Sequence, residues 1–473
     1  MPLGVINTKL KDQYGSRLSC SRQPHLVNAA KIITSLPGQP SNVSFKQYSG
    51  NVVTDAHNGR ALFYYFVQAD VPDPFSRPLT LWLNGESNML YVESPIGVGF
   101  SYSNTSEDYI NWNDTKTANE NLNFLLNWFE GFPDYSTSDL YLTGESYAGN
   151  IYFPVWMYVH RDDADDAGHY IPQLAALIVE YNKKPNIKQI NLKAIALGNP
   201  LLDLDISVNA GVFLWSHGAI SDETLMLEQT VCNESRYLRE YFHDRLSKGC
   251  NDVFNRVGAE VGDDIDSGDL LLTKCISSST AQQIFSKGLF QRLHAELARH
   301  SGRNGDPCLQ HRVFDYLNKP QVQKALHANT TGLPSHWDFC QGPLFYQEDN
   351  MDMNLIPLVS SLLKEGIPIM LYSGDQDTKI PLTQTRIIAN RMAKELNFIP
   401  LTPYAPWYNK KQVGGWAQLF GGPKDGKNVT YITYATVRGA AHEVPFTSPS
   451  QALTLFRALL GVAPLTIRPG RCQ

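Results

Sequence analysis

Three residues spread over the chain carry the side chains that nucleophilic catalysis needs. Ser146 follows the apolar run Leu140–Thr143 within Gly144-Glu-Ser-Tyr-Ala-Gly149, a turn close to the Gly-x-Ser-x-Gly type, with Ala148 in the second glycine position, that lifts a serine above a sheet edge. Asp377 and His442 follow two later apolar runs. A serine hydroxyl needs a base, and the base needs an orienting carboxylate. The chain order therefore predicts a nucleophile, its acid partner and a general base.

Each assignment also has a plainer explanation. A serine beside glycines occurs in ordinary strand-to-helix turns, an aspartate after a strand commonly forms a turn, and most of the 12 histidines are expected at the surface. Asp375 competes with Asp377, because both follow the run Ile367–Tyr372. Three strand ends that deliver serine, aspartate and histidine in this order favour the catalytic interpretation.

The elements that would position these residues alternate between strands and helices. Nearly continuous apolar runs, typical of strands buried on both faces, are Ala61–Val67, Leu79–Leu83, Met89–Glu93, Leu140–Thr143, Ala194–Leu197, Ile367–Tyr372 and Val429–Val437. The clearest helical pattern is Thr115–Phe129, with Asp114 or Thr115 as N-cap. This alternation predicts an α/β fold with a central, mostly parallel sheet flanked by helices.

The pattern changes between about residues 202 and 345. This stretch is mostly helical and holds five of the seven cysteines. We interpret it as a helical insertion, a cap over the strand ends where α/β sheets bind ligands. Residues 1–29 are then an N-terminal extension, and 30–473 form one domain that includes the cap.

The composition excludes several classes of function. With a formal net charge of −6 and 18% charged residues, nothing directs the chain toward nucleic acid. No apolar stretch reaches the length of a membrane span. No CxxC pair is present, and we predict neither a metal nor a cofactor. The aspartates at 162, 163, 165 and 166 lack EF-hand spacing and are interpreted as a solvated acidic tip.

Six N-x-S/T sequons accompany the clustered cysteines and favour the secretory pathway. The predicted glycosylation sites are Asn42, Asn104, Asn113, Asn233, Asn329 and Asn428. The first residues show no continuous apolar stretch typical of a signal peptide. Two alternatives follow: a signal peptide missing from this version, which we favour, or a cytosolic protein with reduced thiols.

The segments resemble the motifs of the plant-type serine carboxypeptidase family, which has the α/β-hydrolase fold. The resemblance runs from about residue 30 to 462 and rests on Gly-Arg-Ala-Leu-Phe-Tyr-Tyr-Phe66, Leu-Thr-Leu-Trp-Leu-Asn-Gly85, Glu-Ser-Pro-Ile-Gly-Val-Gly-Phe-Ser-Tyr102, Gly-Glu-Ser-Tyr-Ala-Gly149, Gly-Asn-Pro200 and Val-Arg-Gly-Ala-Ala-His-Glu-Val-Pro445. It implies release of C-terminal residues from peptides or proteins through an acyl-enzyme.

The resemblance also implies roles for the residues around the serine. It makes Ser146, Asp377 and His442 the triad and Asp375 a structural residue. A further set would bind the substrate: Asn84, Gly85 and a protonated Glu145 at its terminal carboxylate, and the Tyr147 amide as an oxyanion donor. The plainer alternatives are a turn residue at 84 and a solvated flank at 145. The implied disulfides are Cys232–Cys250 and Cys275–Cys308; Cys340 would lack its partner, and the resemblance implies no partner for Cys20 or Cys472.

Two departures from the family pattern bear on activity. After Gly85 the family continues with Gly-Pro-Gly-Cys-Ser-Ser and a helix, whereas here Glu86 follows at once, so the second oxyanion donor is missing. An acidic residue that assists carboxylate recognition is missing with it. The five residues Asn84–Asn88 span about 17 Å when extended, too little to join two full-length parallel strands. We therefore expect residues at the ends of Leu79–Leu83 and Met89–Glu93 to leave the sheet.

The second departure is an insertion of nineteen residues, Asn150–Gly168, directly after Gly149. The deletion and the insertion each interrupt an otherwise intact motif, which suggests an altered splicing event or an error in the gene annotation. A cDNA that contains both junctions would contradict an annotation error. Three functions stay open: a serine carboxypeptidase, an acyltransferase that uses glucose esters, and a catalytically inactive homologue. Glu145, where the transferases commonly carry aspartate, favours the peptidase. Whether the chain forms a homodimer is also left open.

Overall fold

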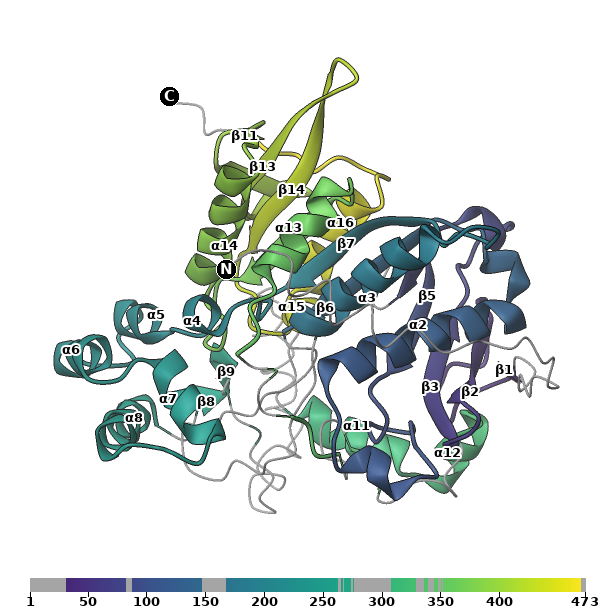
Figure 1. Cartoon of the computed structure of the whole chain (residues 1–473), viewed down its shortest axis with the longest axis horizontal. Helices are drawn as coiled ribbons and strands as arrows, with labels where there is room; N and C mark the ends of the chain where they lie inside the picture. The colour runs from purple at the N-terminus through teal and green to yellow at the C-terminus, as the bar shows by residue number, and fades with distance from the viewer. Residues whose placement is uncertain are drawn as a thin grey trace, which may run out of the picture.

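The fold is described from a computed structural model of the 473-residue chain (Figure 1). The structure describes residues 31–81, 87–146, 167–262, 265–266, 268–273, 275, 308–328, 336–338, 344–347, 350 and 352–468. A twelve-stranded sheet crosses this described part. Within the same residues, no helix combines the length and the apolar character that crossing a membrane requires.

The sheet has the order β1-β2-β3-β5-β4-β6-β7-β10-β14-β13-β11, with β12 paired to β13. Its strands are β1 Lys31–Ile33, β2 Gln47–Asp55, β3 Arg60–Val67, β4 Leu79–Leu81, β5 Asn88–Glu93, β6 Leu140–Glu145, β7 Leu192–Gly198, β10 Ile369–Gly374, β11 Ile399–Pro400, β12 Ala405–Asn409, β13 Gln412–Lys424 and β14 Lys427–Val437. From β5 to β14 all neighbours are parallel, and antiparallel strands flank this block. The predicted mostly parallel sheet is confirmed.

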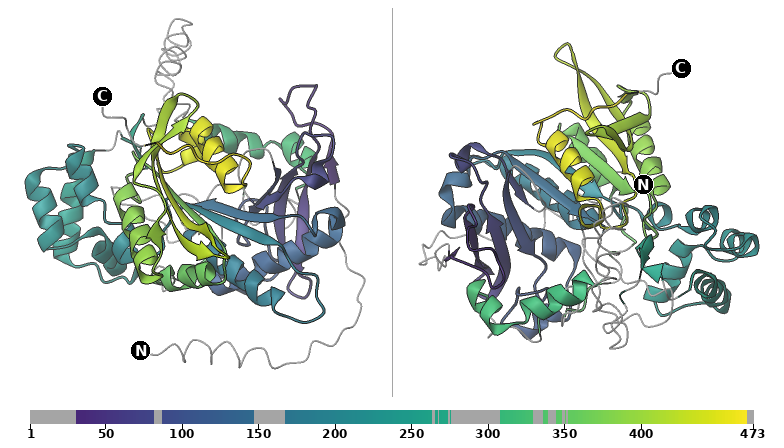
Figure 2. Two further views of the ribbon diagram at one scale, coloured as in Figure 1. Left: turned by 90° about the horizontal axis from the view of Figure 1, so that it is seen from above. Right: turned by 180° about the vertical axis from the view of Figure 1, so that it is seen from behind.

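Helices cover both faces of the sheet (Figure 2). Helices α2 (Asp114–Gly131), α3 (Ala167–Asn182), α13 (Ile356–Lys364) and α14 (Leu382–Glu395) lie on one face, and α11 (Leu309–Leu317), α12 (Pro320–Ala325), α15 (Val444–Thr447) and α16 (Pro449–Leu459) on the other. Strand β3 illustrates how both faces become covered, because its successive apolar side chains point to opposite faces of the sheet. Leu62 and Phe66 join the core under α2 and α3, whereas Phe63 packs with Val322 of α12.

Helix α2 agrees with the predicted Thr115–Phe129 except at its start. The N-cap is Asn113, whose side chain accepts a hydrogen bond from the Lys116 amide at 2.9 Å. The prediction of Asp114 or Thr115 as N-cap was wrong. Asp114 is fully buried inside the first turn, and its carboxylate binds side chains from other segments, contacts that no local pattern reveals.

The first part of the stretch predicted to form a cap folds into a group of short helices at one end of the molecule (Figure 1). It contains α4 (Leu204–Ser207), α5 (Gly211–Ser216), α6 (Asp222–Thr230), α7 (Glu234–Phe242) and α8 (Lys248–Val261), followed by a hairpin of β8 (Ile265–Asp266) and β9 (Asp269–Thr273). Both predicted disulfides, Cys232–Cys250 and Cys275–Cys308, are present. The other three cysteines lie outside the described residues.

Strands β4 and β5 are parallel neighbours although only residues 82–87 join them. Ser87 lies beside β4, since its hydroxyl donates to Thr80 Oγ1 at 3.0 Å. Because β4 has three residues, the chain needs to return only about 7 Å along the strand and step about 5 Å sideways. Six residues can cover that path. Residues 82–86 lie outside the described part, so the expectation that strand ends leave the sheet stays a prediction.

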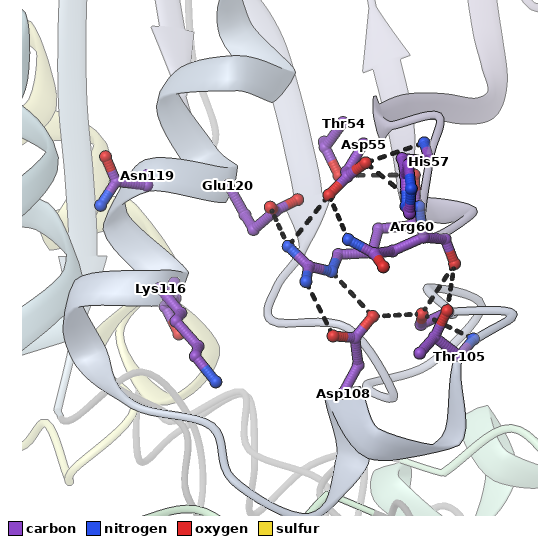
Figure 3. Close-up of polar contacts among 12 residues, drawn as sticks. Thr54, Asp55, His57, Arg60, Thr105, Asp108, Lys116, Asn119 and Glu120 are labelled. Carbon is purple, nitrogen blue, oxygen red and sulfur yellow. Dashed lines mark hydrogen bonds and ion pairs between the residues drawn. The ribbon is translucent and has the colours of Figure 1, made fainter. Parts of the chain in front are cut away.

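Arg60, at the start of β3, binds three carboxylates from separate segments (Figure 3). Its Nε and Nη2 donate to Asp108 at 2.7 and 2.8 Å. Its Nη1 lies 3.1 Å from Glu120 of α2 and 3.4 Å from Asp55 of β2. The side chains of Asp108 and Glu120 are 8% and 6% exposed. One guanidinium thus joins the β2–β3 hairpin to α2 and to the turn that holds Asp108.

Candidate active site

Ser146 stands at the carboxyl end of β6 in a strained backbone conformation. Every residue of β6 is buried, and Ser146 follows with φ of +62°. A non-glycine residue in this region is uncommon and is characteristic of functional sites. The Ser146 amide donates to the carbonyl of Gly198 at 2.8 Å, which fixes the turn to the end of β7. This is the geometry of a serine presented at a strand-to-helix turn.

Asp377 and His442 form a buried pair after β10 and β14. Asp377 Oδ2 lies 2.7 Å from His442 Nδ1, and Oδ1 accepts the amides of Lys379 and Ile380 at 2.8 and 3.1 Å. Asp377 is 0% and His442 4% exposed. A carboxylate at this distance favours the tautomer that carries its proton on Nδ1 and leaves the Nε2 lone pair free to accept a hydrogen bond. Nε2 is buried and has no hydrogen-bond partner within the described residues.

Asn199 connects the serine turn with the histidine loop. It follows Gly198, the residue that binds the Ser146 amide, and has φ of +41°. Its Nδ2 donates to the carbonyl of His442, and its Oδ1 accepts the Gly374 amide at 3.0 Å. Sequence reasoning noted Gly-Asn-Pro200 but gave Asn199 no role. A polar residue between glycine and proline at a strand end was the available signal.

Glu145, directly before the nucleophile, is buried and faces other acids. Its Oε1 accepts the Val444 amide at 3.2 Å, and its carboxyl also bonds the hydroxyl of Tyr372. Burial, reinforced by repulsion from Glu443 and Asp377, raises the pKa of Glu145 well above its ordinary value. The alternative of a solvated flank is therefore wrong. Tyr372 was missed from the sequence, where it is one more apolar residue of β10.

The remaining predicted site residues divide into two groups. Asn84, Gly85 and Tyr147 lie outside the described residues, as does the insertion except for Ala167 and Gly168. Asp375 connects the two loops: its carboxylate accepts the Gly439 amide at 2.7 Å, and its own amide donates to the Val437 carbonyl. No cluster of histidine, cysteine or acidic side chains suited to a metal occurs in the described part.

The predicted sequons differ in their surroundings. Asn42, Asn104, Asn233 and Asn428 are exposed. Asn113 is half-buried, and its Nδ2 donates to Gln347 Oε1 at 2.9 Å. Asn329 lies outside the described residues.

Glu93 ends β5 at the same sheet edge as Ser146 and was not predicted as a special residue. Its carboxylate accepts hydrogen bonds from the Phe100 amide and, at 2.9 Å, from Trp337 Nε1. Burial raises the pKa of Glu93 to about 7 from an ordinary 4.5, against the lowering effect of these two donors. Glu93 thus joins β5 to the turn that follows it and to the segment returning from the cap.

This raised pKa predicts a pH-dependent stability. The folded state binds the Glu93 proton more tightly than the unfolded state, so its contribution is complete below pH 4.5 and is lost as pH rises toward 7. The shift corresponds to about 3 kcal/mol. Between pH 4.5 and pH 7, the free energy of unfolding of the wild type should therefore fall by about 3 kcal/mol more than that of Glu93→Gln. Urea titration of both proteins at the two pH values measures this difference. Equal pH slopes for the two proteins would contradict the prediction.

A serine with positive φ after β6 and a buried aspartate–histidine pair after β10 and β14, all at the carboxyl edge of a mostly parallel sheet, define an α/β hydrolase. A family model described as serine carboxypeptidase matches residues 37–85, 86–161 and 166–461. The chain belongs to the serine carboxypeptidase family, which confirms the resemblance found in its motifs. The first two matched segments meet between residues 85 and 86, where the family pattern is interrupted.

Curated relatives and a solved structure agree with this membership. Serine carboxypeptidase-like 46 of Arabidopsis thaliana is 41% identical, with 93% of this chain and 94% of the relative covered. Serine carboxypeptidase-like 45 of the same plant is 40% identical, with 92% of each covered. The prohormone-processing carboxypeptidase Kex1(delta)p from Saccharomyces cerevisiae matches with a TM-score of 0.58 and 18% identity over 92% of this chain and 93% of its own, which shows the shared fold.

Proposed function

We propose that this chain acts as a serine-type carboxypeptidase that removes residues from the C-termini of peptides or proteins. His442 Nε2 takes the proton of Ser146 Oγ, which attacks the carbonyl carbon of the last peptide bond. The imidazolium then gives its proton to the departing amino acid, and water hydrolyses the acyl-enzyme with His442 again as base. The observation that carries the proposal is the 2.7 Å bond between Asp377 Oδ2 and His442 Nδ1, at the sheet edge where the strained Ser146 also stands.

Labelling with a fluorophosphonate probe tests this proposal. The probe reacts with an activated serine, so we expect it to modify Ser146 in the folded protein and to leave Ser146→Ala unlabelled. A blocked dipeptide and a sinapoyl-type glucose ester then distinguish hydrolysis from acyl transfer. Folded, soluble protein that resists the probe would contradict the proposal.

A second candidate, the inactive homologue, has one specific observation in its favour. Glu86 follows Gly85 directly, so the glycine that supplies the second oxyanion donor in the family is missing. Loss of one such donor typically lowers turnover by about 100-fold or more. The probe separates these candidates, because the inactive homologue would show neither labelling nor turnover.

Glu145 gives the proposed peptidase a defined pH dependence. We infer that its protonated carboxyl donates a hydrogen bond to the terminal carboxylate of the substrate. Since burial raises the pKa of Glu145, the proton is retained through the acidic range and is lost as pH rises past the raised pKa. The ionised form repels the substrate, so KM should rise by about tenfold or more.

The variant Glu145→Gln isolates this effect. Its amide donates at every pH, so we expect its KM for a peptide to stay flat where the KM of the wild type rises. Measuring KM and kcat separately across the pH range checks this. A KM in Glu145→Gln that follows the wild-type profile would assign the titration to another group.

We also infer passage through the secretory pathway. The two disulfides need an oxidising compartment, and four of the predicted sequons are exposed. Digestion of the expressed protein with an N-glycosidase should lower its apparent mass. No change in mass, together with free thiols at Cys232 and Cys250, would favour the cytosolic alternative.

A further inference from the structure

The sequence around the insertion contains the same dipeptide twice. Ala148–Gly149 precedes the inserted residues, and Ala167–Gly168 closes them directly before His169. Removing residues 148–166, 149–167 or 150–168 therefore yields one identical protein, in which Ser-Tyr-Ala-Gly-His runs without interruption. Sequence comparison alone cannot tell which glycine belongs to the serine turn.

Of the two copies, the structure describes Gly168, and its contacts place it at the serine turn. Helix α3 begins at Ala167, and the Gly168 amide donates to the carbonyl of Ser146 at 2.7 Å. In an uninterrupted chain, a residue three positions after the serine would make this bond as the helix leaves the turn. Gly168 thus occupies the third place after Ser146 in space, although it is twenty-two positions away in sequence.

The surroundings of Gly168 require a glycine. A Cβ built on this residue would lie 2.4 Å from the carbonyl oxygen and 2.8 Å from the amide nitrogen of Leu201. Both are backbone atoms of the segment that follows Asn199, so neither can move aside as a flexible side chain would. Gly168 therefore lets α3 approach the loop that also holds the Ser146 amide and the His442 carbonyl.

Hydrogen bonds of the residues that follow Gly168 also hold the start of α3 in this place, and they do not depend on where Gly168 lies in the sequence relative to Ser146. His169 is 0% exposed, and its Nδ1 lies 2.8 Å from Asp114 Oδ2. Gln173 Nε2 donates to the same oxygen at 2.9 Å, and Tyr346 donates to Asp114 Oδ1 at 2.8 Å. The buried carboxylate at the start of α2 thus anchors the first turn of α3.

We propose that Gly168, not Gly149, is the glycine of the nucleophile turn. Gly168 is a positioning residue for Ser146. The assignment deepens the proposed function, since it concerns the same serine, but the fold around Gly168 does not depend on Ser146 being reactive.

Two matched alanine variants test the assignment. In Gly168→Ala the new methyl group displaces the helix from Leu201, and we expect the rate of fluorophosphonate labelling to fall by about 100-fold, together with a lower thermal midpoint. In Gly149→Ala we expect a labelling rate and a midpoint close to those of the wild type. Labelling is measured well below the midpoint of each variant, so that loss of reactivity is separated from unfolding.

A deletion variant supplies the reference. Removing residues 149–167 leaves a single glycine in Ser-Tyr-Ala-Gly-His, and alanine at that glycine should reproduce the loss seen in Gly168→Ala. Equal effects of Gly149→Ala and Gly168→Ala, a larger effect of Gly149→Ala, or no effect of either would overturn the assignment. If the probe did not label the wild type, that result would contradict the proposed function but not the assignment of Gly168. The thermal midpoints of Gly149→Ala and Gly168→Ala would still test the assignment.

Discussion

Replacing Asp377 with asparagine is expected to lower the rate of Ser146 labelling by about 10⁴-fold. Asp377 Oδ1 accepts two backbone amides, from Lys379 and Ile380, so in Asp377→Asn the amide oxygen takes that place. The Nδ2 group then faces His442 Nδ1 and donates to it. Nε2 must carry the proton in that tautomer and can no longer accept one from Ser146. The second-order rate constant for the probe measures the loss.

Asp375→Asn is the matched control for this prediction. Asp375 lies two residues away, and its carboxylate accepts the Gly439 amide, a bond that an asparagine oxygen can keep. We expect its labelling rate to fall by less than about tenfold. If Asp375→Asn proved the more damaging of the two, the acid of the triad would have to be reassigned.

Replacing Arg60 with methionine is expected to destabilise the fold by about 3–5 kcal/mol. The change keeps much of the aliphatic stem but leaves Asp108 and Glu120 buried without their cation. Burial already raises the pKa of Glu120 although Arg60 is present, so its ionised form is costly there. Urea unfolding at pH 7 should show the loss, and acid should shrink it, since protonation removes the abandoned charges.

Arg391→Met is the control for a surface ion pair. Arg391 binds Glu395 at 2.9 Å on α14, and both side chains are about half exposed. Such pairs contribute about 0–1 kcal/mol, so this variant should unfold close to the wild type. Similar losses in the two variants, or a loss in Arg60→Met that is the same at pH 4 and pH 7, would contradict the role given to the buried network.

The strands and the reactive residues could be predicted because local patterns determine them. Each buried parallel strand is a short apolar run, and the turn after it shows as a polar or glycine-rich step. Val429–Val437 was predicted within two residues of the observed β14. Ser146, Asp377 and His442 each follow such a run, so their shared sheet edge follows from strand direction alone.

Residues whose roles depend on contacts between distant segments could not be predicted in this way. Tyr372 reads as an apolar strand residue, yet it bonds Glu145. Asn199 reads as a turn residue, yet it connects two loops of the site. Arg60 starts a strand with no sign of its three carboxylates. Apart from Asp55, which is five positions from Arg60, these partners lie dozens of positions away, and only the assembled sheet brings them near.

The three-residue strand β4 also has a consequence for how the molecule opens. Within the described residues it meets β5 and β6 through three residue pairs each, whereas β6 and β7, like β10 and β14, share six. Strands β6, β10 and β14, which precede Ser146, Asp377 and His442, all lie on the same side of β4 in the sheet. Native-state hydrogen exchange should therefore show two cooperative units that separate at Leu79–Leu81, with the unit holding the serine and the histidine the slower to exchange.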